Sequence, residues 1–92
     1  MEFEWDEAKR AANIEKHGLD FLQAAQLFDG RPAITASTSR GGEARWKTTG
    51  LIEDVFITVI RTAREGGVRI ISARRAWNAE ERQYWAIHGR GD

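Results

Sequence analysis

The spacing of apolar and polar residues changes once along this chain, close to Pro32. Before that point it is mostly helical, and after it apolar residues tend to alternate with polar ones, as they do in strands. The alternation over residues 3–5 predicts a short strand at the start of the chain. A helix is expected next over residues 7–17, with Asp6 as its N-cap and Gly18 as its C-terminal stop.

A second, shorter helix is expected over residues 21–28, with Asp20 as its N-cap. Four of its apolar side chains fall on one helical face, and we predict that this face lies in the core. These four residues are Phe21, Ala24, Ala25 and Phe28. The turn residues from Asp29 to Pro32 end this helix.

Four strands follow, and the turns between them contain glycine or acidic residues. The strands are predicted at residues 33–37, 44–52, 55–63 and 68–73, with turns at 39–43, 53–54 and 65–67. A last helix is expected from about Asn78 to His88. The predicted fold class is therefore α+β: a short N-terminal strand, two helices, a four-stranded antiparallel meander and a C-terminal helix, with the helices on one face of a curved sheet.

Length and composition then limit the class of protein. Ninety-two residues, 41% of them apolar and 30% charged, predict a single globular domain over residues 1–92. No apolar run approaches the ~18 residues of a spanning helix, and no signal peptide is visible, so we expect a cytoplasmic protein without a membrane partner. There are no cysteines, and two distant histidines do not form a ligand set, so neither a metal nor a cofactor is expected.

The net charge of zero conceals a division between two parts of the chain. Residues 1–30 carry seven acids and three bases, whereas residues 31–92 carry seven acids and eleven bases. Ten of the eleven arginines lie in the second part. Because the arginine fork binds phosphate and stacks on bases, this division predicts an anionic partner for the second part. Ordinary solvated surface charge is the alternative.

Strand parity decides which of these cations can meet. Arg45 and Lys47 point to one face of their strand and Trp46 to the other. In the last strand, Arg69 and Ile71 are expected on one face, with Ile70 and Ser72 on the opposite one. The pair Arg74–Arg75 follows, so one arginine can face the helices while the other faces the open side of the sheet. With Arg61, these cations form a candidate phosphate site, unless Arg45, Lys47 and Arg61 serve only to keep an exposed sheet face soluble.

The helices carry further candidates. In the first helix Lys9, Asn13, Lys16 and His17 fall near one side, and His17 could transfer protons or simply cap the C-terminus of that helix. In the last helix Tyr84 could be a packed ring or a proton donor. Such a set of side chains suits metal-free cleavage of RNA, in which the 2′-hydroxyl of the substrate is the nucleophile and the protein supplies cations and proton-transfer groups.

Two motifs resemble those of the BrnT toxins of bacterial type II toxin–antitoxin systems. The first is W-D-x-x-K-x-x-x-N-x-x-K-H-G at residues 5–18. The second is R-I-I-S-A-R-x-A at residues 69–76, followed by Glu81 and Tyr84. The likeness runs from Phe3 to about Trp85, although Trp77 and the turn at Gly41-Gly42 look less typical of the family.

This resemblance implies a fold similar to RelE-type ribonuclease toxins and an activity as an mRNA endonuclease, free or on the ribosome. Carried over by position, it matches Lys16, His17, Glu43, Arg45, Arg74, Glu81 and Tyr84. Together with Lys47, Arg61 and Arg75 from the strand argument, these matches give a candidate site of nine residues besides Glu81. The catalytic candidates are His17, Glu43, Arg45, Arg74 and Tyr84, and the RNA-binding candidates are Lys16, Lys47, Arg61 and Arg75. Arg74 is expected to contact the scissile phosphate, and Arg75 to bind RNA or brace Glu81.

The resemblance also implies a partner, a BrnA-type antitoxin with a ribbon-helix-helix domain. A dimeric antitoxin would give a 2:2 complex, which would bind operator DNA only through the antitoxin. The antitoxin is expected to cover the strand of Arg45 and Lys47. Two alternatives stay open: a non-catalytic RNA- or protein-binding module, and a degenerate toxin kept for its complex with the antitoxin.

Overall fold

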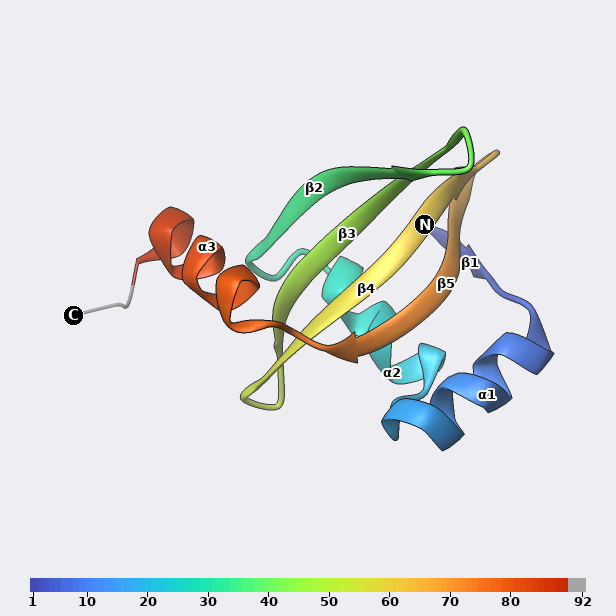
Figure 1. Cartoon of the computed structure of the whole chain (residues 1–92), viewed down its shortest axis with the longest axis horizontal. Coiled ribbons are helices and arrows are strands. Elements are labelled where there is room, and N and C mark those ends of the chain that lie inside the picture. Colours follow the sequence, from blue (N-terminus) through green and yellow to red (C-terminus); the bar gives the residue numbers. More distant parts are fainter. Residues whose placement is uncertain (90–92) are drawn as a thin grey trace.

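The computed structural model describes residues 1–89, with the side chain of Arg40 left out (Figure 1). The elements follow in the order β1 (Glu2–Glu4), α1 (Glu7–His17), α2 (Phe21–Ala24), the 3-10 helix η1 (Ala25–Phe28), β2 (Ala33–Arg40), β3 (Glu43–Ile52), β4 (Val55–Arg64), β5 (Gly67–Arg75) and α3 (Asn78–His88). The predicted α+β class and the predicted order of strands and helices are confirmed.

The described strands form one five-stranded sheet in the order β1-β5-β4-β3-β2. Strands β2 to β5 are the predicted antiparallel meander, and β1 adds to its edge in parallel with β5. Gly67 permits this addition, since a Cβ atom at that position would lie only 2.1 Å from the carbonyl oxygen of Glu2. The sheet is therefore mixed.

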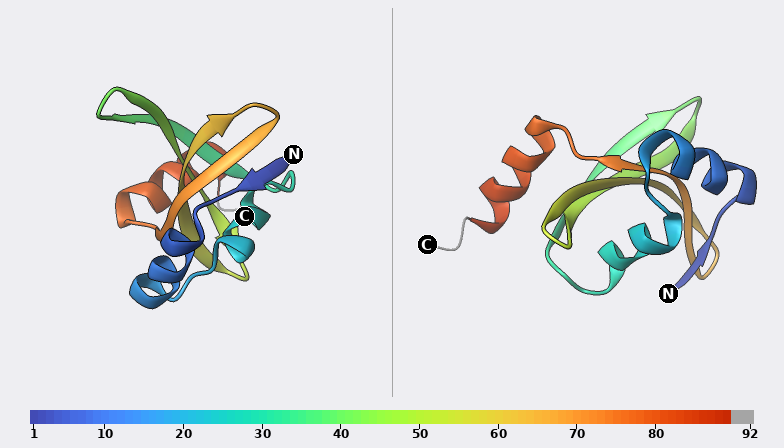
Figure 2. Two further views of the ribbon diagram at one scale, coloured as in Figure 1. Left: turned by 90° about the vertical axis from the view of Figure 1, so that its right-hand side faces the viewer. Right: turned by 90° about the horizontal axis from the view of Figure 1, so that it is seen from below.

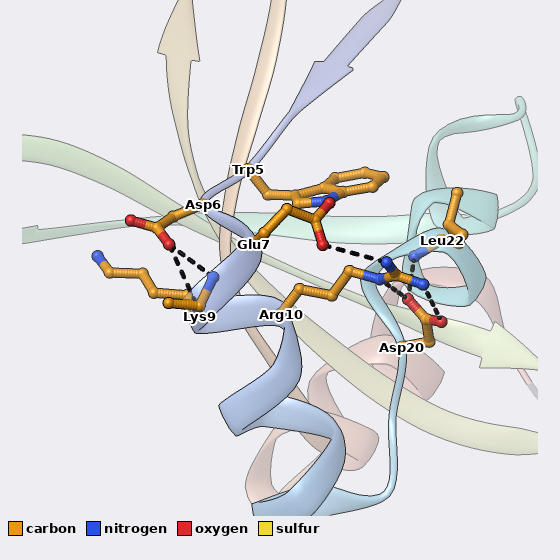
Figure 3. A network of polar contacts seen from close by, with 8 residues as sticks. Trp5, Asp6, Glu7, Lys9, Arg10, Asp20 and Leu22 are labelled. Atoms are coloured by element: carbon orange, nitrogen blue, oxygen red, sulfur yellow. Dashed lines mark hydrogen bonds and ion pairs between the residues drawn. The ribbon is translucent and has the colours of Figure 1, made fainter.

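Caps begin and end α1 as its sequence predicts. The carboxylate of Asp6 accepts a hydrogen bond of 2.8 Å from the backbone N–H of Ala8, and Gly18 ends the helix in the left-handed conformation, with φ of 69°. Arg10 then joins α1 to α2, because its guanidinium binds both carboxylate oxygens of Asp20 at 2.8 and 2.9 Å (Figure 3). Asp20 is also the N-cap of α2, so one carboxylate caps one helix and holds the other.

Asn13 fixes α1 against the sheet. Its side chain is buried, and its amide nitrogen donates to the carbonyl oxygens of Leu19 and Ala73, both at 2.9 Å. Its oxygen accepts from the backbone N–H of Ala73 at 3.1 Å. β1 pairs only with residues 67–69 of β5, so farther along the strand this single amide takes the place of a neighbouring strand.

The second helix differs from its prediction. After one α-helical turn it tightens into the 3-10 helix η1. Three residues per turn replace 3.6, so Leu27 becomes the buried residue of the last turn while Phe28 and Ala25 stay at the margin of the core. Phe21 and Ala24 are buried as predicted. The rest of the buried core comes from the sheet: Ile52, Ile57, Val59, Val68, Ile70 and Ala73.

The expectation that all helices cover one face of the sheet is wrong. α1, α2 and η1 lie on the face of Ile57 and Val59, whereas α3 contacts β2 and β3 and reaches Thr58, which points to the opposite face (Figure 2). α3 follows β5 after two residues and leads away from α1, so the two helices lie at opposite ends of the molecule (Figure 1). Within residues 1–89, one side of the sheet thus carries the core, and α3 is the helix that covers part of the other side.

A β-bulge in β5 changes which side chains share a face. Ile60 pairs with Ser72 and Arg61 with Ile70, so Ile71 is an extra residue without a partner in β4. Ser72 therefore lies on the same side as Ile71 and lines the same cavity, contrary to the predicted alternation. Because the parity is reversed beyond the bulge, Ala73 points to the core and Arg74 to the open face.

Candidate active site

A cavity of about 350 Å³ lies on the open face of the sheet, opposite α1 and α2. Its cations come from two strands that are not neighbours, Arg45 and Lys47 on β3 and Arg74 on β5, and Ile60 of β4 lies between them. The other lining residues are Thr38, Ile71, Ser72 and Trp77. The bulge is what brings Arg74 to this face, so the cavity depends on it.

Glu80, in the first turn of α3, organises two of the three cations. Its carboxylate is bound by both terminal nitrogens of Arg74, at 2.8 and 2.9 Å, and by Nζ of Lys47 at 3.0 Å. The hydroxyl of Thr58 and the backbone N–H of Trp77 also donate to it. Only 1% of Glu80 is exposed, so this carboxylate is buried and fully engaged.

The surroundings of Glu80 set its charge. Burial by itself would raise the pKa of this carboxyl, but the hydrogen bonds from Arg74, the Trp77 N–H, Lys47 and Thr58 outweigh it and hold the pKa at about 2. Glu80 is therefore ionised at neutral pH and is a weak base. It holds cations in place and is unsuited to accepting a proton.

Arg45 is held less tightly than Arg74. Its ion pair with Glu43 spans 3.6 Å, and its Nε atom is buried without a hydrogen-bond partner among the described residues. Arg74, in contrast, is hydrogen-bonded to Glu80, and its guanidinium carbon lies 3.8 Å from the centre of the Trp77 ring. Three cations face two carboxylates here, which leaves an excess of one positive charge. Such a cavity suits a single phosphate group.

Comparison with known families bears on this geometry. A family model described as the ribonuclease toxin BrnT of type II toxin–antitoxin systems matches residues 5–80. The chain belongs to the BrnT family. No individual curated protein matches it. The family is one of ribonuclease toxins, which implies an antitoxin as partner.

The BrnT match contains most of the predicted site residues, yet the fold divides them. Glu43, Arg45, Lys47 and Arg74 lie at or beside the open-face cavity. His17 and Arg75 line another cavity, of about 250 Å³, on the side of α1 and α2. The alternation of Arg74 and Arg75 thus separates the pair, as expected.

Three further candidates lie apart from the cavity. Lys16 is exposed on α1. Arg61 was expected beside Arg45 and Lys47, but it points to the helix side, with its guanidinium 5.4 Å from the ring centre of Phe28 and 5.5 Å from that of Trp46. Burial there lowers its pKa. The expected grouping of Arg61 with the other cations is therefore wrong, because Arg61 shares the parity of Val59.

Tyr84 lies in an aromatic cluster rather than in the cavity. It is buried, and its ring centre is 5.1 Å from those of Phe56 and Trp85 and 4.7 Å from that of His88. It also follows the end of the BrnT match at Glu80. Its position favours the packing alternative over the proton donor.

Sequence reasoning missed Glu80 as a site residue. Its carboxylate pairs with Arg74, six positions earlier in the chain. A signal did exist, because Glu80 is the third residue of α3, where an acid can accept from the N-cap backbone. The sequence does not show that Glu80 also binds Lys47, which lies 33 positions earlier.

Within residues 1–89, no helix is long and apolar enough to cross a membrane. The same part of the chain contains no group of three histidine, aspartate or glutamate side chains placed to hold a metal ion.

Proposed function

We propose that this chain is a metal-independent endoribonuclease that cleaves mRNA in the cytoplasm, inhibits translation and is neutralised by a BrnA-type antitoxin. The observation that carries the proposal is the cavity in which Arg45, Lys47 and Arg74 converge, in a chain of a ribonuclease toxin family. Their donors can hold the negative charge that develops on a phosphate under attack.

In the proposed reaction the 2′-oxygen of one nucleotide forms a bond to the adjacent phosphorus, and the bond from phosphorus to the 5′-oxygen breaks. The proton of the 2′-hydroxyl goes to a base, the 5′-oxygen takes a proton from an acid, and a 2′,3′-cyclic phosphate results. Glu43 is the base that its position favours, since it is half exposed and adjoins Arg45. His17 is disfavoured because it lies on the other side of the sheet.

For the antitoxin we propose that it covers the open face of the sheet and so closes the cavity. A dimeric ribbon-helix-helix partner would give a 2:2 complex that binds operator DNA through the antitoxin alone. The excess positive charge of the cavity supports an acidic segment as the covering element.

The decisive experiment is cleavage of a long single-stranded RNA by the purified chain, with and without EDTA. We expect EDTA-resistant cleavage that leaves 2′,3′-cyclic phosphate ends, and a loss of about 10²–10³-fold in rate for Arg45→Ala. The melting temperature should hardly change, because the ion pair of Arg45 is long and partly exposed. Arg64→Ala, which removes an exposed arginine of β4 outside the cavity, is the matched control and should cleave normally.

Loss of cleavage in EDTA, restored by a divalent cation, would contradict metal independence. If bare RNA stays intact, the same variants are tested on translating ribosomes. Failure there as well would favour a non-catalytic binding module or a degenerate toxin. In that case neither the wild type nor the variants would cleave RNA. The Arg45→Ala and Glu43→Gln variants would then differ from the wild type only in their affinity for RNA.

Arg74→Ala is a poorer test than it appears from the sequence. Sequence reasoning predicts an inactive variant with an unchanged melting temperature, but the structure shows Arg74 neutralising a buried carboxylate. Removing it leaves Glu80 with Lys47 as its remaining cation, which should cost about 3 kcal/mol of unfolding free energy in urea titrations. Equal stability of Arg74→Ala and Arg64→Ala would show that the Glu80 pairs contribute little.

A further inference from the structure

We propose that Trp77 is the stacking surface for one unpaired base of the RNA, next to the phosphate held by the cations. This inference rests on the proposed function, and it specifies the substrate class as single-stranded RNA. Trp77 lines the cavity and is 60% exposed. Of the four tryptophans, all of which lie in the part that the structure describes, it is the exposed one.

One face of the Trp77 ring is already occupied. The guanidinium carbon of Arg74 lies 3.8 Å from the ring centre, and Nζ of Lys47 lies 5.5 Å from it. Both cations bind the same carboxylate oxygen of Glu80, Oε2, so they approach the ring from one side. With 60% of the residue exposed, the other face of the indole is open to a ligand.

The backbone of Trp77 and the cation under its ring are positioned before any ligand arrives. The backbone N–H of Trp77 donates to Oε1 of Glu80 at 2.8 Å, and Arg74, which supports the ring, is fixed by two bonds to the same carboxylate. A fixed aromatic surface loses little entropy when a base stacks on it. The large exposed aliphatic side chains of the helices, Ile14, Leu22 and Ile87, are not among the residues that line this cavity.

A flat aromatic surface beside a phosphate site is the arrangement that recognises unpaired nucleotides. The cations bind the backbone, and the ring accepts the face of an adjacent base. In a duplex both faces of each base are covered by its neighbours, so a duplex cannot use this surface. Stacking tolerates any base but is stronger for the larger purine, so adenine should bind better than uracil.

The test measures binding of short 2′-O-methyl oligomers, which the chain cannot cleave because the 2′-oxygen is blocked. The three probes are oligoadenylate, oligouridylate and an abasic oligomer with the same backbone. We expect the wild type to bind oligoadenylate roughly 5- to 100-fold more tightly than the abasic oligomer. Trp77→Ala should abolish this preference, Trp77→Phe should keep part of it, and Leu22→Ala, which removes an exposed side chain on α2, should leave it unchanged.

Two results would overturn the inference. One is that Trp77→Ala weakens binding of the abasic oligomer as much as that of oligoadenylate, which would mean that Trp77 only positions Arg74. The other is that a duplex of the same length binds as tightly as the single strand. Cleavage of unmodified RNA, measured in parallel, separates this inference from the proposed function: cleavage without a base preference refutes only the stacking, and a base preference without cleavage refutes only the enzyme.

Discussion

At the scale of single residues, Glu80 shows how a buried charge can build a site for the opposite charge. Lys47 and Arg74 would repel each other on a bare sheet face, and the carboxylate between them holds both within hydrogen-bond distance of its oxygens. Thr58 and Trp77 add two further donors to the same carboxylate. The cations are thereby arranged before a phosphate arrives.

The low pKa of Glu80 predicts a specific dependence of stability on pH. Because the pKa falls from 4.5 to about 2 on folding, the stabilisation is complete above about pH 4.5 and is lost as the pH falls toward 2. Glu80→Gln lacks this contribution, which is on the order of 2–3 kcal/mol. Urea unfolding of both proteins over this range should show the difference between their free energies shrinking as the pH falls.

The comparison with Glu80→Gln is needed because Asp20 and Asp29 also have pKa values of about 2 and titrate in the same range. Those two carboxylates are present in both proteins, so their effect cancels in the difference. A difference that stays constant from pH 5 to pH 2 would show that the carboxylate of Glu80 is not the titrating group.

At the scale of elements, the attachment of α1 to β5 rests on one polar side chain. The edge of β5 beyond β1 has backbone groups that no strand pairs, and Asn13 provides both a donor and an acceptor for Ala73. A hydrophobic residue at this position could pack but could not satisfy these groups. The polar cluster expected on α1 is thus divided, with Asn13 buried while Lys9, Lys16 and His17 are exposed.

Asn13→Ala should therefore lower the free energy of unfolding by about 2–4 kcal/mol, since it leaves buried backbone groups unpaired. Lys9→Ala, one turn earlier on the exposed side, is the control and should change stability by less than about 0.5 kcal/mol. Urea titration followed by tryptophan fluorescence measures both. Similar midpoints for the two variants would mean that water replaces the amide at no cost.

At the scale of the whole molecule, the sheet separates two functions by its two faces. α1 and α2 cover one face of the sheet (Figure 2). That face holds the apolar core, and the opposite face holds the cation cavity. Charge is also distributed unevenly along the chain: acids outnumber bases in residues 1–30, and ten of the eleven arginines lie in residues 31–92. A chain of zero net charge can in this way present a local positive surface.

This local charge sets the expected salt dependence of RNA binding. With one phosphate neutralised by the single excess positive charge of the cavity, the logarithm of the affinity for single-stranded RNA should fall with the logarithm of salt concentration at a slope of about −0.7. Removing one cation, as in Arg45→Ala, should reduce the slope by about 0.7. Binding titrations with 2′-O-methyl RNA at several salt concentrations measure this slope, and an unchanged slope in the variant would place Arg45 outside the contact.

The sequence by itself determined the elements and their order. Asp6, Gly18 and Asp20 mark the helix ends, and the change of spacing near Pro32 marks the start of the meander, because caps and periodicity act over only a few residues. The resemblance to the BrnT toxins, later confirmed, also rests on short motifs. These features need no knowledge of distant contacts.

Only the tertiary structure decided which side chains meet. The bulge at Ile71 reverses the parity of β5 and brings Arg74 to the face of Lys47, and a reversal by one residue leaves no trace in the spacing of apolar positions. The sequence also leaves no trace of the contact between Glu80 and Lys47, which are 33 residues apart. Nor does it show that Arg61 lies near the rings of Phe28 and Trp46 on the other face. A site assembled from four strands and the start of a helix depends on register and packing, which local sequence does not specify.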